Sequence, residues 1–346
     1  MGNHEILIAG GGPAGAAAAI SALQEGSSVQ LLERAKTPRH KVCGEFLSPG
    51  IREFMEVFHL QNEFAALGPC PLRRCALHLG KHTNRWTFPE SAWGLSRLQL
   101  DRLLLSKASA LGGGVRRGEA FDFRQGGDGE ARMIVACGRK PAARGGERLF
   151  GFKAHFEGPS DDAVELFFDA CGYIGVSGIE NRLTNVCGIA RESILRRYGF
   201  EFDEFIRRSP PLADRLAPLR RRMRWLVVAP LSFSPPALAP GGDHDYWAGD
   251  SLGFVDPFTG SGILGALVTG RLAGLAASRG IPNTAYHQVC RSLLQRPYAV
   301  ASVLRRLLGH TELYPLARYL PGRQLFHWTR TNTERAMEAT RLMSGC

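Results

Sequence analysis

The sequence predicts an α/β protein with a βαβ unit at its N-terminus, an inserted, mainly antiparallel β-sheet and a helical C-terminal region. A glycine-rich turn at 10–15 separates a strand-like run from a helix-like run, and a second strand-like run follows. Residues 149–190 alternate short apolar runs with Gly, Asp and Asn, which is typical of antiparallel strands. After Gly260 the chain reads as helical through to Met343, with interruptions expected at Pro282, Pro297, Pro315 and Pro321.

The expected elements follow the order of the chain, and each rests on the spacing of its apolar residues. The N-terminal unit holds a strand at His4–Ala9, a helix at Pro13–Glu25 and a strand at Val29–Glu33. The segment Arg97–Leu111 is expected to be a helix with one buried apolar face. Further strands are expected at Leu72–Leu79, Arg85–Phe88, Ala120–Arg124, Arg132–Ala136, Leu149–Phe156, Val164–Phe168, Tyr173–Ser177, Leu183–Ile189 and Tyr246–Ala248.

Composition indicates a globular protein with enough apolar residues for a large core. The chain has 346 residues, of which 44% are hydrophobic and 22% are charged. Its eight cysteines are scattered, so we expect reduced thiols in a reducing compartment. No targeting signal is visible at the N-terminus. The weakly charged stretch Ser251–Ser278 contains Asp256, Pro257 and several glycines, which favour a loop and a buried helix over a membrane span. We therefore expect a cytoplasmic location.

The net charge of +11 permits two interpretations. It can attract phosphates, an acidic substrate or an anionic membrane surface, or it can simply reflect an arginine-rich solvated surface. The densest cluster, Arg220–Arg222 with Arg224, fits the second interpretation. No nucleic-acid-binding motif accompanies the charge, so we expect no nucleic-acid partner.

The turn after the first strand satisfies the dinucleotide fingerprint G-x-G-x-x-G. Gly10 permits the tight turn, Gly12 lets backbone amides approach a pyrophosphate, and Gly15 allows close packing of helix on strand. Glu33 ends the second strand at the spacing of the acid that binds an adenosine ribose. This context predicts an ADP-containing dinucleotide but does not separate FAD from NAD. The cofactor contacts expected in this half are Gly10, Gly12, Pro13, Ala14, Gly15, Glu33 and Arg34.

A second glycine-rich element lies more than 200 residues downstream. Gly249-Asp250 follows a strand, so the carboxylate can accept a ribitol hydroxyl, although such a residue can also merely cap a turn. Gly260–Gly262 at a helix start offers free amides to negative charge. An NAD site does not need this second half, whereas an FAD site does, so the pair predicts FAD. The contacts expected here are Gly249, Asp250, Pro257, Gly260, Ser261 and Gly262.

With these two elements the chain resembles the FAD-dependent oxidoreductases of the p-hydroxybenzoate hydroxylase-type fold. It is most similar to the branch that contains geranylgeranyl reductases, FixC-type dehydrogenases and flavin-dependent halogenases. The resemblance implies a three-layer, Rossmann-like FAD-binding domain. It also implies that Arg97 helps to hold the cofactor, that Gly249–Asp250 contacts the flavin ribitol and pyrophosphate, and that Pro257–Gly262 borders the isoalloxazine. The matching segments are Ile6–Glu33, Lys41–Pro49, Ser96–Leu104, Gly172–Gly188 and Gly249–Gly274.

Three sites near the expected flavin need separate interpretation. The family usually has Asp-Gly where this chain has Cys137-Gly138, so no cofactor contact is carried over to Cys137. Cys43 matches a segment beside the flavin in the reductase branch, and its thiol is either redox active or simply packed. Glu45 would bind a substrate hydroxyl or transfer a proton, or else be a surface carboxylate beside Lys41. Cys43 and Glu45 are the candidate catalytic residues.

A zinc site is not expected. The cysteines and histidines that invite one do not have the spacing of a common ligand set, and strand alternation would send them to different faces. They are Cys70, Cys75, His78 and His82.

Few catalytic side chains are expected, because a flavin carries the chemistry. The first expectation is a monooxygenase that hydroxylates or epoxidises an apolar or aromatic secondary metabolite, polyketide or isoprenoid, with NAD(P)H as external reductant. The alternatives are a flavin-dependent reductase or dehydrogenase of C=C bonds, a non-catalytic flavoprotein electron carrier, and an NAD-binding protein without flavin. The Trp-x-Trp-x-Ile-Pro signature of halogenases is absent, which disfavours halogenation.

The resemblance also suggests how the chain is divided. Residues 1–70, 96–145 and 245–280 are expected to form the FAD-binding domain, 71–95 and 146–244 the substrate-binding domain, and 281–346 a helical C-terminal region. The expected partners are a hydrophobic small-molecule substrate and a reductase or electron-transfer protein. The segment Arg291–Arg330 would cap the substrate domain or, as a basic amphipathic surface, make a peripheral membrane contact.

Overall fold

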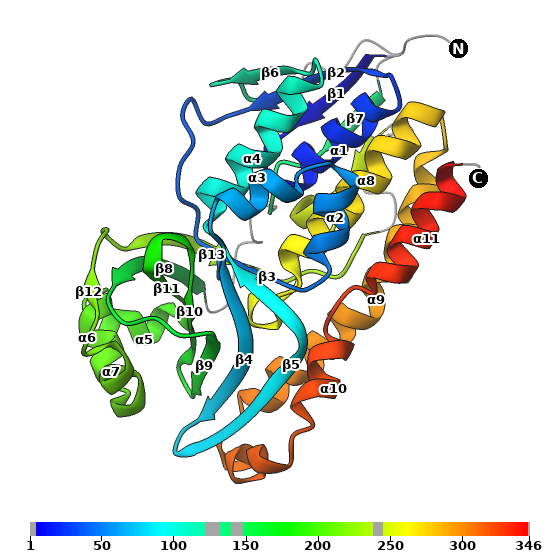
Figure 1. Cartoon of the computed structure of the whole chain (residues 1–346). Helices are drawn as coiled ribbons and strands as arrows, with labels where there is room; N and C mark the ends of the chain where they lie inside the picture. Colours follow the sequence, from blue (N-terminus) through cyan, green and yellow to red (C-terminus); the bar gives the residue numbers. More distant parts are fainter. Residues whose placement is uncertain (1–4, 122–131, 140–147, 238–244, 345–346) are drawn as a thin grey trace.

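The computed structural model describes residues 5–121, 132–139, 148–237 and 245–344 (Figure 1). It contains a parallel sheet next to the N-terminus, a separate larger sheet, and a series of C-terminal helices along one side of both. The predicted α/β class, with its Rossmann-like sheet, inserted sheet and helical C-terminal region, is confirmed.

The first sheet is entirely parallel and has the strand order β14-β7-β1-β2-β6. Its helices α1 (Pro13–Gln24), α4 (Arg97–Ala110) and α8 (Gly262–Arg279) pack together on the sheet. Ile6 and Ile8 of the central strand are fully buried, as expected for a strand covered by other layers. The strand bounds are β1 (Glu5–Ala9), β2 (Ser28–Glu33), β6 (Gly114–Arg117), β7 (Arg132–Val135) and β14 (Asp245–Trp247).

The topology of this sheet brings the two glycine-rich elements together. The chain passes from β1 to β2 on one side, whereas β7 lies on the other side of β1, so β1 ends at a switch point where the connections diverge. The carboxyl ends of parallel strands share one edge. Gly10 after β1, Ala136 after β7 and Gly249 after β14 therefore lie at the same edge.

Helices α1 and α8 approach closely because small residues line both. A Cβ added at Gly270 would overlap the carbonyl oxygen of Ala14, and one at Gly274 would overlap the carbonyl oxygen of Ala18. The close approach places the start of α1 next to the Gly249 turn, since a Cβ at Gly249 would lie 2.8 Å from Cβ of Ala14.

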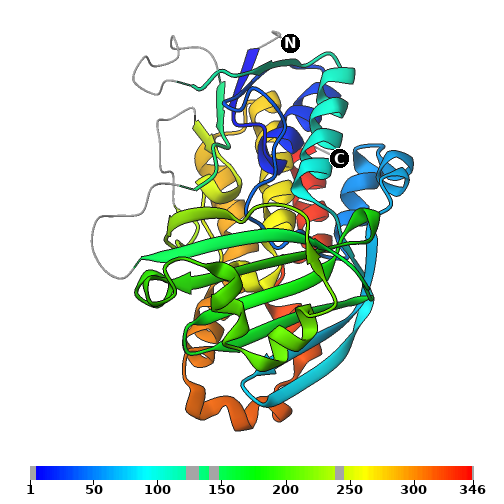
Figure 2. The ribbon, with the colours of Figure 1, turned by 90° about the vertical axis from the view of Figure 1, so that its left-hand side faces the viewer.

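The second sheet is mixed and has the order β12-β8-β11-β10-β9-β4-β5-β3, with β13 also paired to β8. Its pairs are antiparallel except for β4 and β9, which run parallel. Figure 2 shows its strands crossing below the first sheet. The bounds are β3 (Phe46–Leu47), β4 (Cys70–Leu79), β5 (His82–Gly94), β8 (Leu149–Glu157), β9 (Ala163–Asp169), β10 (Gly172–Gly178), β11 (Leu183–Arg191), β12 (Arg220–Arg221) and β13 (Leu226–Leu231).

Strand alternation gives the second sheet two different faces. On β8, Phe152, Ala154 and Phe156 join a core with the three short helices that cover the outer face. Lys153 and His155 alternate with them and point to the other face, toward the loop at 41–45. The covering helices are α5 (Glu192–Arg197), α6 (Phe202–Arg207) and α7 (Pro210–Leu216).

The C-terminal region contains α9 (Asn283–Leu308), η4 (Thr311–Tyr319), α10 (Gly322–Trp328) and α11 (Thr333–Ser344). The interruption expected at Pro297 is wrong, because α9 continues through this buried proline. Apolar packing on both sides of Pro297 compensates for the one hydrogen bond that it removes. Within the described segments, no helix combines the length and apolar character that crossing a bilayer requires.

Other local expectations also differ from the structure. Ala120 and Phe121 are not in a strand, and the rest of the expected strand to Arg124 lies outside the described residues. The strand of this region is the earlier β6, a short edge strand whose basic sequence carries no apolar alternation. Helices α2 (Ile51–Val57) and α3 (Gln61–Ala66) were not predicted, because each is too short for a clear helical period.

Candidate functional site

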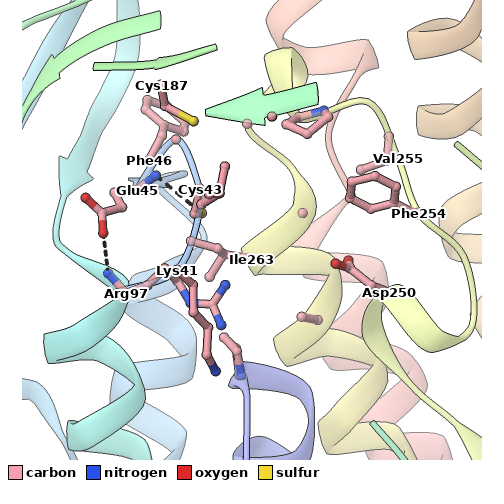
Figure 3. A pocket seen from close by; sticks show the side chains of 18 of the residues that line it. Lys41, Cys43, Glu45, Phe46, Arg97, Cys187, Asp250, Phe254, Val255 and Ile263 are labelled. Carbon is pink, nitrogen blue, oxygen red and sulfur yellow. Dashed lines mark hydrogen bonds between the residues drawn. The ribbon is translucent and has the colours of Figure 1, made fainter. Parts of the chain in front are cut away.

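A cavity of about 1300 Å³ extends from the shared edge of the parallel sheet to the inner face of the second sheet (Figure 3). Ligand pockets usually measure roughly 300–1,000 Å³, so this cavity has room for a dinucleotide and a second molecule. Its far end is walled by apolar residues of the second sheet and of the C-terminal helices, namely Leu77, Val164, Leu166, Leu304, Leu308, Leu320 and Leu325.

The first half of the dinucleotide cradle is built by β1, its turn and β2. Gly10 has a φ of +108°, and a Cβ there would overlap the carbonyl oxygen of Ala136, so only glycine fits. Glu33 is held at the end of β2 by two backbone amides, those of Gly11 at 2.9 Å and Ala35 at 2.8 Å. The N-terminus of α1 has no side-chain cap, which leaves its amides available to an anion.

The second half is built by the turn after β14. Gly249 has a φ of +60°, and its amide donates to Thr269 Oγ1 of α8 at 2.9 Å. Ser251 donates to the carbonyl oxygen of Gly138 at 2.9 Å, which ties the turn to the end of β7. Tyr286 of α9 donates to the carbonyl oxygen of Trp247 at 2.9 Å. Three separate elements therefore fix the turn that presents Asp250.

The Asp250 carboxylate points into the cavity opposite Lys41, Cys43 and Arg97 (Figure 3). Burial raises its pKa, and the positive charges of Arg97 and Arg139 oppose that rise. In the described part of the chain this carboxylate has no hydrogen-bond partner. A desolvated acceptor at the end of a glycine turn fits the hydroxyls of a ribitol chain, which would supply the missing donors.

The structure brings most of the expected cofactor residues to one cavity. Gly15 and Ser261 are the two that do not line it; Gly15 instead packs against Gly10, as its expected role in helix–strand packing requires. The cavity-lining members are Gly10, Gly12, Pro13, Ala14, Glu33, Arg34, Cys43, Arg97, Gly249, Asp250, Pro257, Gly260 and Gly262. Their roles toward a cofactor stay predictions.

Arg97 begins α4 and lines the cavity. Its Nε and Nη2 atoms donate to the two carboxylate oxygens of Asp101 at 2.9 and 3.2 Å, and Lys41 Nζ donates to the same carboxylate at 2.9 Å. Its Nη2 atom lies 3.7 Å from the position that a Cβ would take on Gly12. The guanidinium is thus held beside the amides expected to bind a pyrophosphate, where its positive charge is complementary to phosphate.

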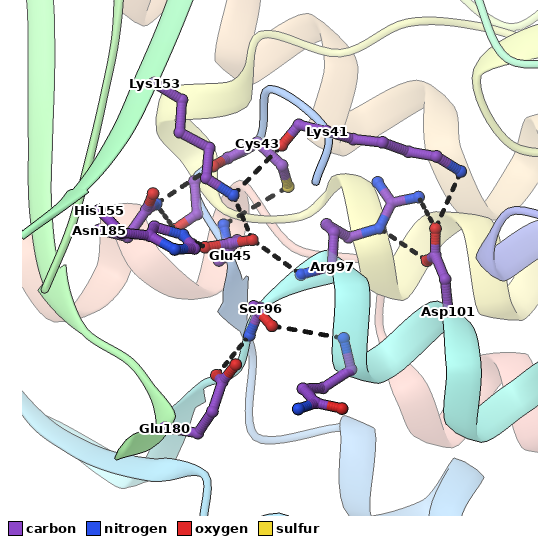
Figure 4. A network of polar contacts seen from close by, with 12 residues as sticks. Lys41, Cys43, Glu45, Ser96, Arg97, Asp101, Lys153, His155, Glu180 and Asn185 are labelled. Atoms are coloured by element: carbon purple, nitrogen blue, oxygen red, sulfur yellow. Dashed lines mark hydrogen bonds and ion pairs between the residues drawn. The ribbon is translucent and has the colours of Figure 1, made fainter. Parts of the chain in front are cut away.

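Glu45 is fully buried and is neither a surface residue nor a partner of Lys41 (Figure 4). Its carboxylate forms an ion pair with the buried Lys153, accepts from the amide of Arg97 at 2.8 Å, and lies 2.7 Å from Nε2 of His155. Burial would raise its pKa, but His155 and Lys153 hold the pKa below its usual value. The surface interpretation is therefore wrong, and with its carboxylate engaged by these partners Glu45 is better suited to holding the loop than to binding substrate.

The thiol of Cys43 lines the cavity, and its sulfur accepts from the amide of Glu45 at 3.4 Å. Asn185 of β11 donates to the carbonyl oxygens of Cys43 and Gly44 at 3.1 and 2.9 Å, so the loop is fixed to the second sheet. Cys137 also lines the cavity and donates to the carbonyl oxygen of Ala9 at 3.3 Å. Burial raises the pKa of Cys137, which keeps it a neutral thiol rather than an anionic acceptor.

Two groups of residues carry side chains that could ligate a metal. His78 is engaged with Thr83 and stacks on Phe167 rather than joining Cys70, Cys75 and His82. In the described segments the ligand atoms of His40, Glu45 and His155 do lie within 4.8 Å of one another. The Lys153 ammonium already pairs with Glu45, and a metal cation beside it would be repelled.

Asp256 is a buried carboxylate that starts the loop before α8. Its Oδ1 atom accepts from Tyr173 at 3.2 Å and from the amide of Phe258 at 3.3 Å, and Arg305 lies 3.6 Å from Oδ2. Burial raises the pKa of Asp256 to about 6, although these three contacts oppose the rise. The loop expected to border a flavin therefore carries an acid that titrates near neutral pH.

We expect Asp256→Asn to stabilise the protein above pH 6 by up to about 3 kcal/mol, since each pKa unit corresponds to about 1.4 kcal/mol. The folded-state pKa is raised, so the cost of ionising Asp256 is absent below its unfolded pKa near 4, grows as the pH rises from there, and is complete above about pH 6. Asparagine keeps the acceptor for Tyr173 and Phe258. Urea unfolding at pH 4 and pH 8 tests this, and an equal effect at both pH values would contradict it.

Sequence reasoning missed several residues of the site. Lys153 could have been found, because alternation on the predicted strand Leu149–Phe156 separates Lys153 and His155 from Phe152 and Ala154. Leu304, Leu308, Phe326 and Arg330 could not, because nothing local indicates that these helices close the cavity.

Comparison with known proteins identifies the first part of the chain. Residues 3–140 match the family model described as an FAD binding domain. A flavin-dependent halogenase from Armillaria mellea is 32% identical over 123 residues, which cover 32% of this chain and 23% of the halogenase. The chain thus spans about a quarter of the length of that relative. A menaquinone reductase from Mycolicibacterium smegmatis is 28% identical over 88% of this chain and 83% of its own length.

Solved structures share the fold over nearly the whole chain. A flavin-dependent brominase superposes with a TM-score of 0.78 and 17% identity, covering 99% of this chain and 97% of the brominase. A geranylgeranyl bacteriochlorophyll reductase-like protein from Thermoplasma acidophilum superposes with a TM-score of 0.72 and 19% identity, covering 97% and 95%. At these identities the structural likeness establishes the fold alone.

Proposed function

We propose that this chain oxidises or reduces an apolar small molecule beside a bound FAD. The premise is that the chain belongs to the superfamily of FAD-dependent oxidoreductases that includes flavin-dependent halogenases and geranylgeranyl-type reductases. The observation that carries this proposal is the continuous cavity, which joins the dinucleotide cradle to an apolar wall. An electron carrier needs no such space beside its flavin, so the cavity favours an enzyme.

The residues of the cradle suit FAD. Glu33 would accept from the adenosine ribose, the amides at the start of α1 would bind the pyrophosphate, and Arg97 would neutralise it. Asp250 would accept from the ribitol hydroxyls. Bound FAD supplies hydride exchange with a substrate or, once reduced, reaction with oxygen. The chain itself positions the substrate against the Pro257–Gly262 loop and excludes water through the apolar wall.

Two reactions at this site have separate support. Monooxygenation of an apolar or aromatic metabolite is the first, supported by the flavin-dependent halogenases among the relatives and the fold neighbours. Reduction of a C=C bond is the second, supported by the menaquinone reductase, whose match covers most of both chains, and by the Cys43 thiol in the cavity, which can donate a proton. NAD(P)H, or a separate reductase protein, would supply electrons in either reaction.

One experiment separates the two reactions. The FAD-loaded protein is reduced chemically without oxygen and mixed with geranylgeraniol or 4-hexylphenol. Anaerobic reoxidation of the flavin, with a product heavier by two hydrogens, indicates C=C reduction. If the flavin reoxidises only when ¹⁸O₂ is added and the product gains one labelled oxygen, the protein is a monooxygenase. Reoxidation by oxygen with hydrogen peroxide as the sole product, over a wider panel of apolar compounds, would contradict both.

The FAD assignment predicts the effect of Asp250→Ala. We expect FAD affinity to fall about 10- to 100-fold, because hydrogen bonds to a charged group contribute about 1.5–3 kcal/mol. We also expect the cofactor-free variant to be more stable than the cofactor-free parent at neutral pH, because a desolvated carboxylate is removed. Flavin fluorescence titration measures the first effect and urea unfolding the second. Glu312→Gln, at an exposed carboxylate, is the control, and unchanged FAD affinity in Asp250→Ala would contradict the assignment.

A further inference from the structure

Arg330 is a cation in the wall of the cavity, and no acidic residue of the described segments pairs with it. It follows α10, and its guanidinium lies over the ring of Phe326, 3.1 Å from the ring centroid, and 5.3 Å from the centroid of Phe46. In the described part of the chain no carboxylate lies within 4 Å of it. By contrast, the interior cations Arg97 and Lys153 are paired with Asp101 and Glu45.

One edge of the Arg330 guanidinium is left without a partner. Nη1 donates to the carbonyl oxygen of Phe326 at 2.7 Å, whereas the buried Nε has no hydrogen-bond partner. Nη2 lies 3.4 Å from the position that a Cβ would take on Gly260, in the loop expected to border the flavin. Nε and Nη2 together form the edge of a guanidinium that binds a carboxylate through two parallel hydrogen bonds.

A second unpartnered donor belongs to the same region. Trp86 lines the cavity, and its buried Nε1–H has no hydrogen-bond partner. Trp86 lies opposite Cys75 across the β4–β5 pair, and it packs with Phe326 against the apolar cluster that contains Phe46 and Cys75. The ring of Trp86 also rests on Gly322 of α10, the helix that carries Phe326. Strand β5 and the segment after α10 therefore each present an unsatisfied donor beside the same aromatic cluster.

An unpaired cation in this position is costly without a ligand. Removing a charge from water has a large free-energy cost, and contact with aromatic faces offsets only part of it. An anion would satisfy the cation and the free donors together, while the leucines farther along the cavity can bury only an apolar body. A ligand matching both features is amphipathic, with an acidic group at the Arg330 end.

We propose that Arg330, with Trp86, binds a carboxylate group of the substrate, so that the substrate is an apolar acid. This rests on the proposed function, because it places the carboxylate end of the substrate beside the Gly260 loop and hence beside the flavin. Arg330 is a binding and specificity residue in this arrangement. The planar Nε–Nη2 edge matches a planar carboxylate better than a spherical halide.

The test compares acids with their uncharged amides in the FAD-loaded protein. Dodecanoate is paired with dodecanamide and 2-naphthoate with 2-naphthamide, and binding is followed by tryptophan fluorescence and flavin absorbance. We expect at least one acid to bind about tenfold or more tightly than its amide, as a charge-assisted hydrogen bond predicts. In Arg330→Met the ratio of acid affinity to amide affinity should fall to about one, and Arg330→Lys should retain part of the preference for the acid. Arg323→Met, at an exposed arginine of the preceding helix α10, should leave this ratio unchanged.

FAD affinity and melting temperature of each variant separate a lost binding site from a misfolded protein. We expect Arg330→Met to bind FAD normally and to have an unchanged or higher melting temperature, because it removes an unpaired charge. Trp86→Phe should lower the acid-to-amide ratio without abolishing it, which gives a second variant if Arg330→Met folds poorly. If the parent protein does not bind FAD at all, that result contradicts the proposed function rather than the carboxylate site.

Three results would overturn the carboxylate site. The first is equal affinity for acid and amide in the parent protein, and the second is an acid preference that survives in Arg330→Met. The third is Arg330-dependent binding of chloride or bromide alone with no preference for the acids, which would show a halide site. If neither acid binds to the parent protein at millimolar concentration, the carboxylate site is overturned in the same way as by the first result.

Discussion

Replacing Glu45 with glutamine is expected to lower the free energy of unfolding by about 3–5 kcal/mol at pH 7, the usual cost of leaving a buried charge unpaired. Lys153 is fully buried, and among the described residues its one hydrogen bond besides that to Glu45 is a weak one to the carbonyl oxygen of Lys41 at 3.3 Å. Glutamine can still accept from the amide of Arg97 but cannot neutralise the ammonium. Urea unfolding of the two proteins measures the difference.

The pH dependence of this effect has a defined sign. The folded-state pKa of Glu45 lies below its usual value. The contribution of Glu45 to the free energy of unfolding is therefore fully present above the unfolded pKa and is lost as the pH falls through the folded pKa. The difference in the free energy of unfolding between the parent and Glu45→Gln should therefore be largest near neutral pH and should decrease at acidic pH.

A second substitution should rescue the first. Adding Lys153→Met to Glu45→Gln removes the uncompensated charge, and we expect the double variant to recover most of the lost stability. Glu157→Gln serves as the control, because Glu157 pairs with Arg220 and Arg222 at the surface and should cost less than about 1 kcal/mol. A cost for Glu45→Gln no larger than that of the control would show that the buried pair is not needed for stability.

Replacing Gly270 with alanine is expected to destabilise the protein by about 3 kcal/mol and to weaken FAD binding at the same time. The new Cβ would overlap the carbonyl oxygen of Ala14, and a backbone atom cannot move aside as a flexible side chain can. The resulting shift of α8 away from α1 would carry Thr269, which holds the amide of Gly249. Both halves of the cofactor cradle would thus be displaced.

The same helix offers a matched control for Gly270→Ala. A Cβ at Gly265 would lie 3.6 Å from Cδ2 of Leu294, which is ordinary van der Waals contact. Gly265→Ala should therefore stabilise the protein by about 0.5–1 kcal/mol, because alanine loses less backbone entropy in a helix. Thermal unfolding and flavin fluorescence titration of both variants test the pair. Equal stability of the two alanine variants would contradict the importance of the α1–α8 contact.

Local patterns predicted the parts of the fold that depend on neighbouring residues. The strand, glycine turn and helix of residues 5–24 match the prediction closely, because apolar spacing and the glycine requirement are both set within a few residues. Segments with weak periodicity were missed or shortened. The hairpin β4–β5 is longer than expected, and β6 was not recognised, because charged and polar residues interrupt their apolar alternation.

The sequence by itself determined the two glycine-rich elements and, through their pairing, the FAD-binding fold. Glycine is required at Gly10 by backbone geometry, which a sequence motif records directly. Only the tertiary structure decided which charges are paired and which are not. Glu45 meets Lys153 across 108 residues, whereas Arg330, just after α10, reaches the cavity without an acidic partner among the described residues. Such contacts depend on how distant elements pack, and no local spacing of residues encodes them.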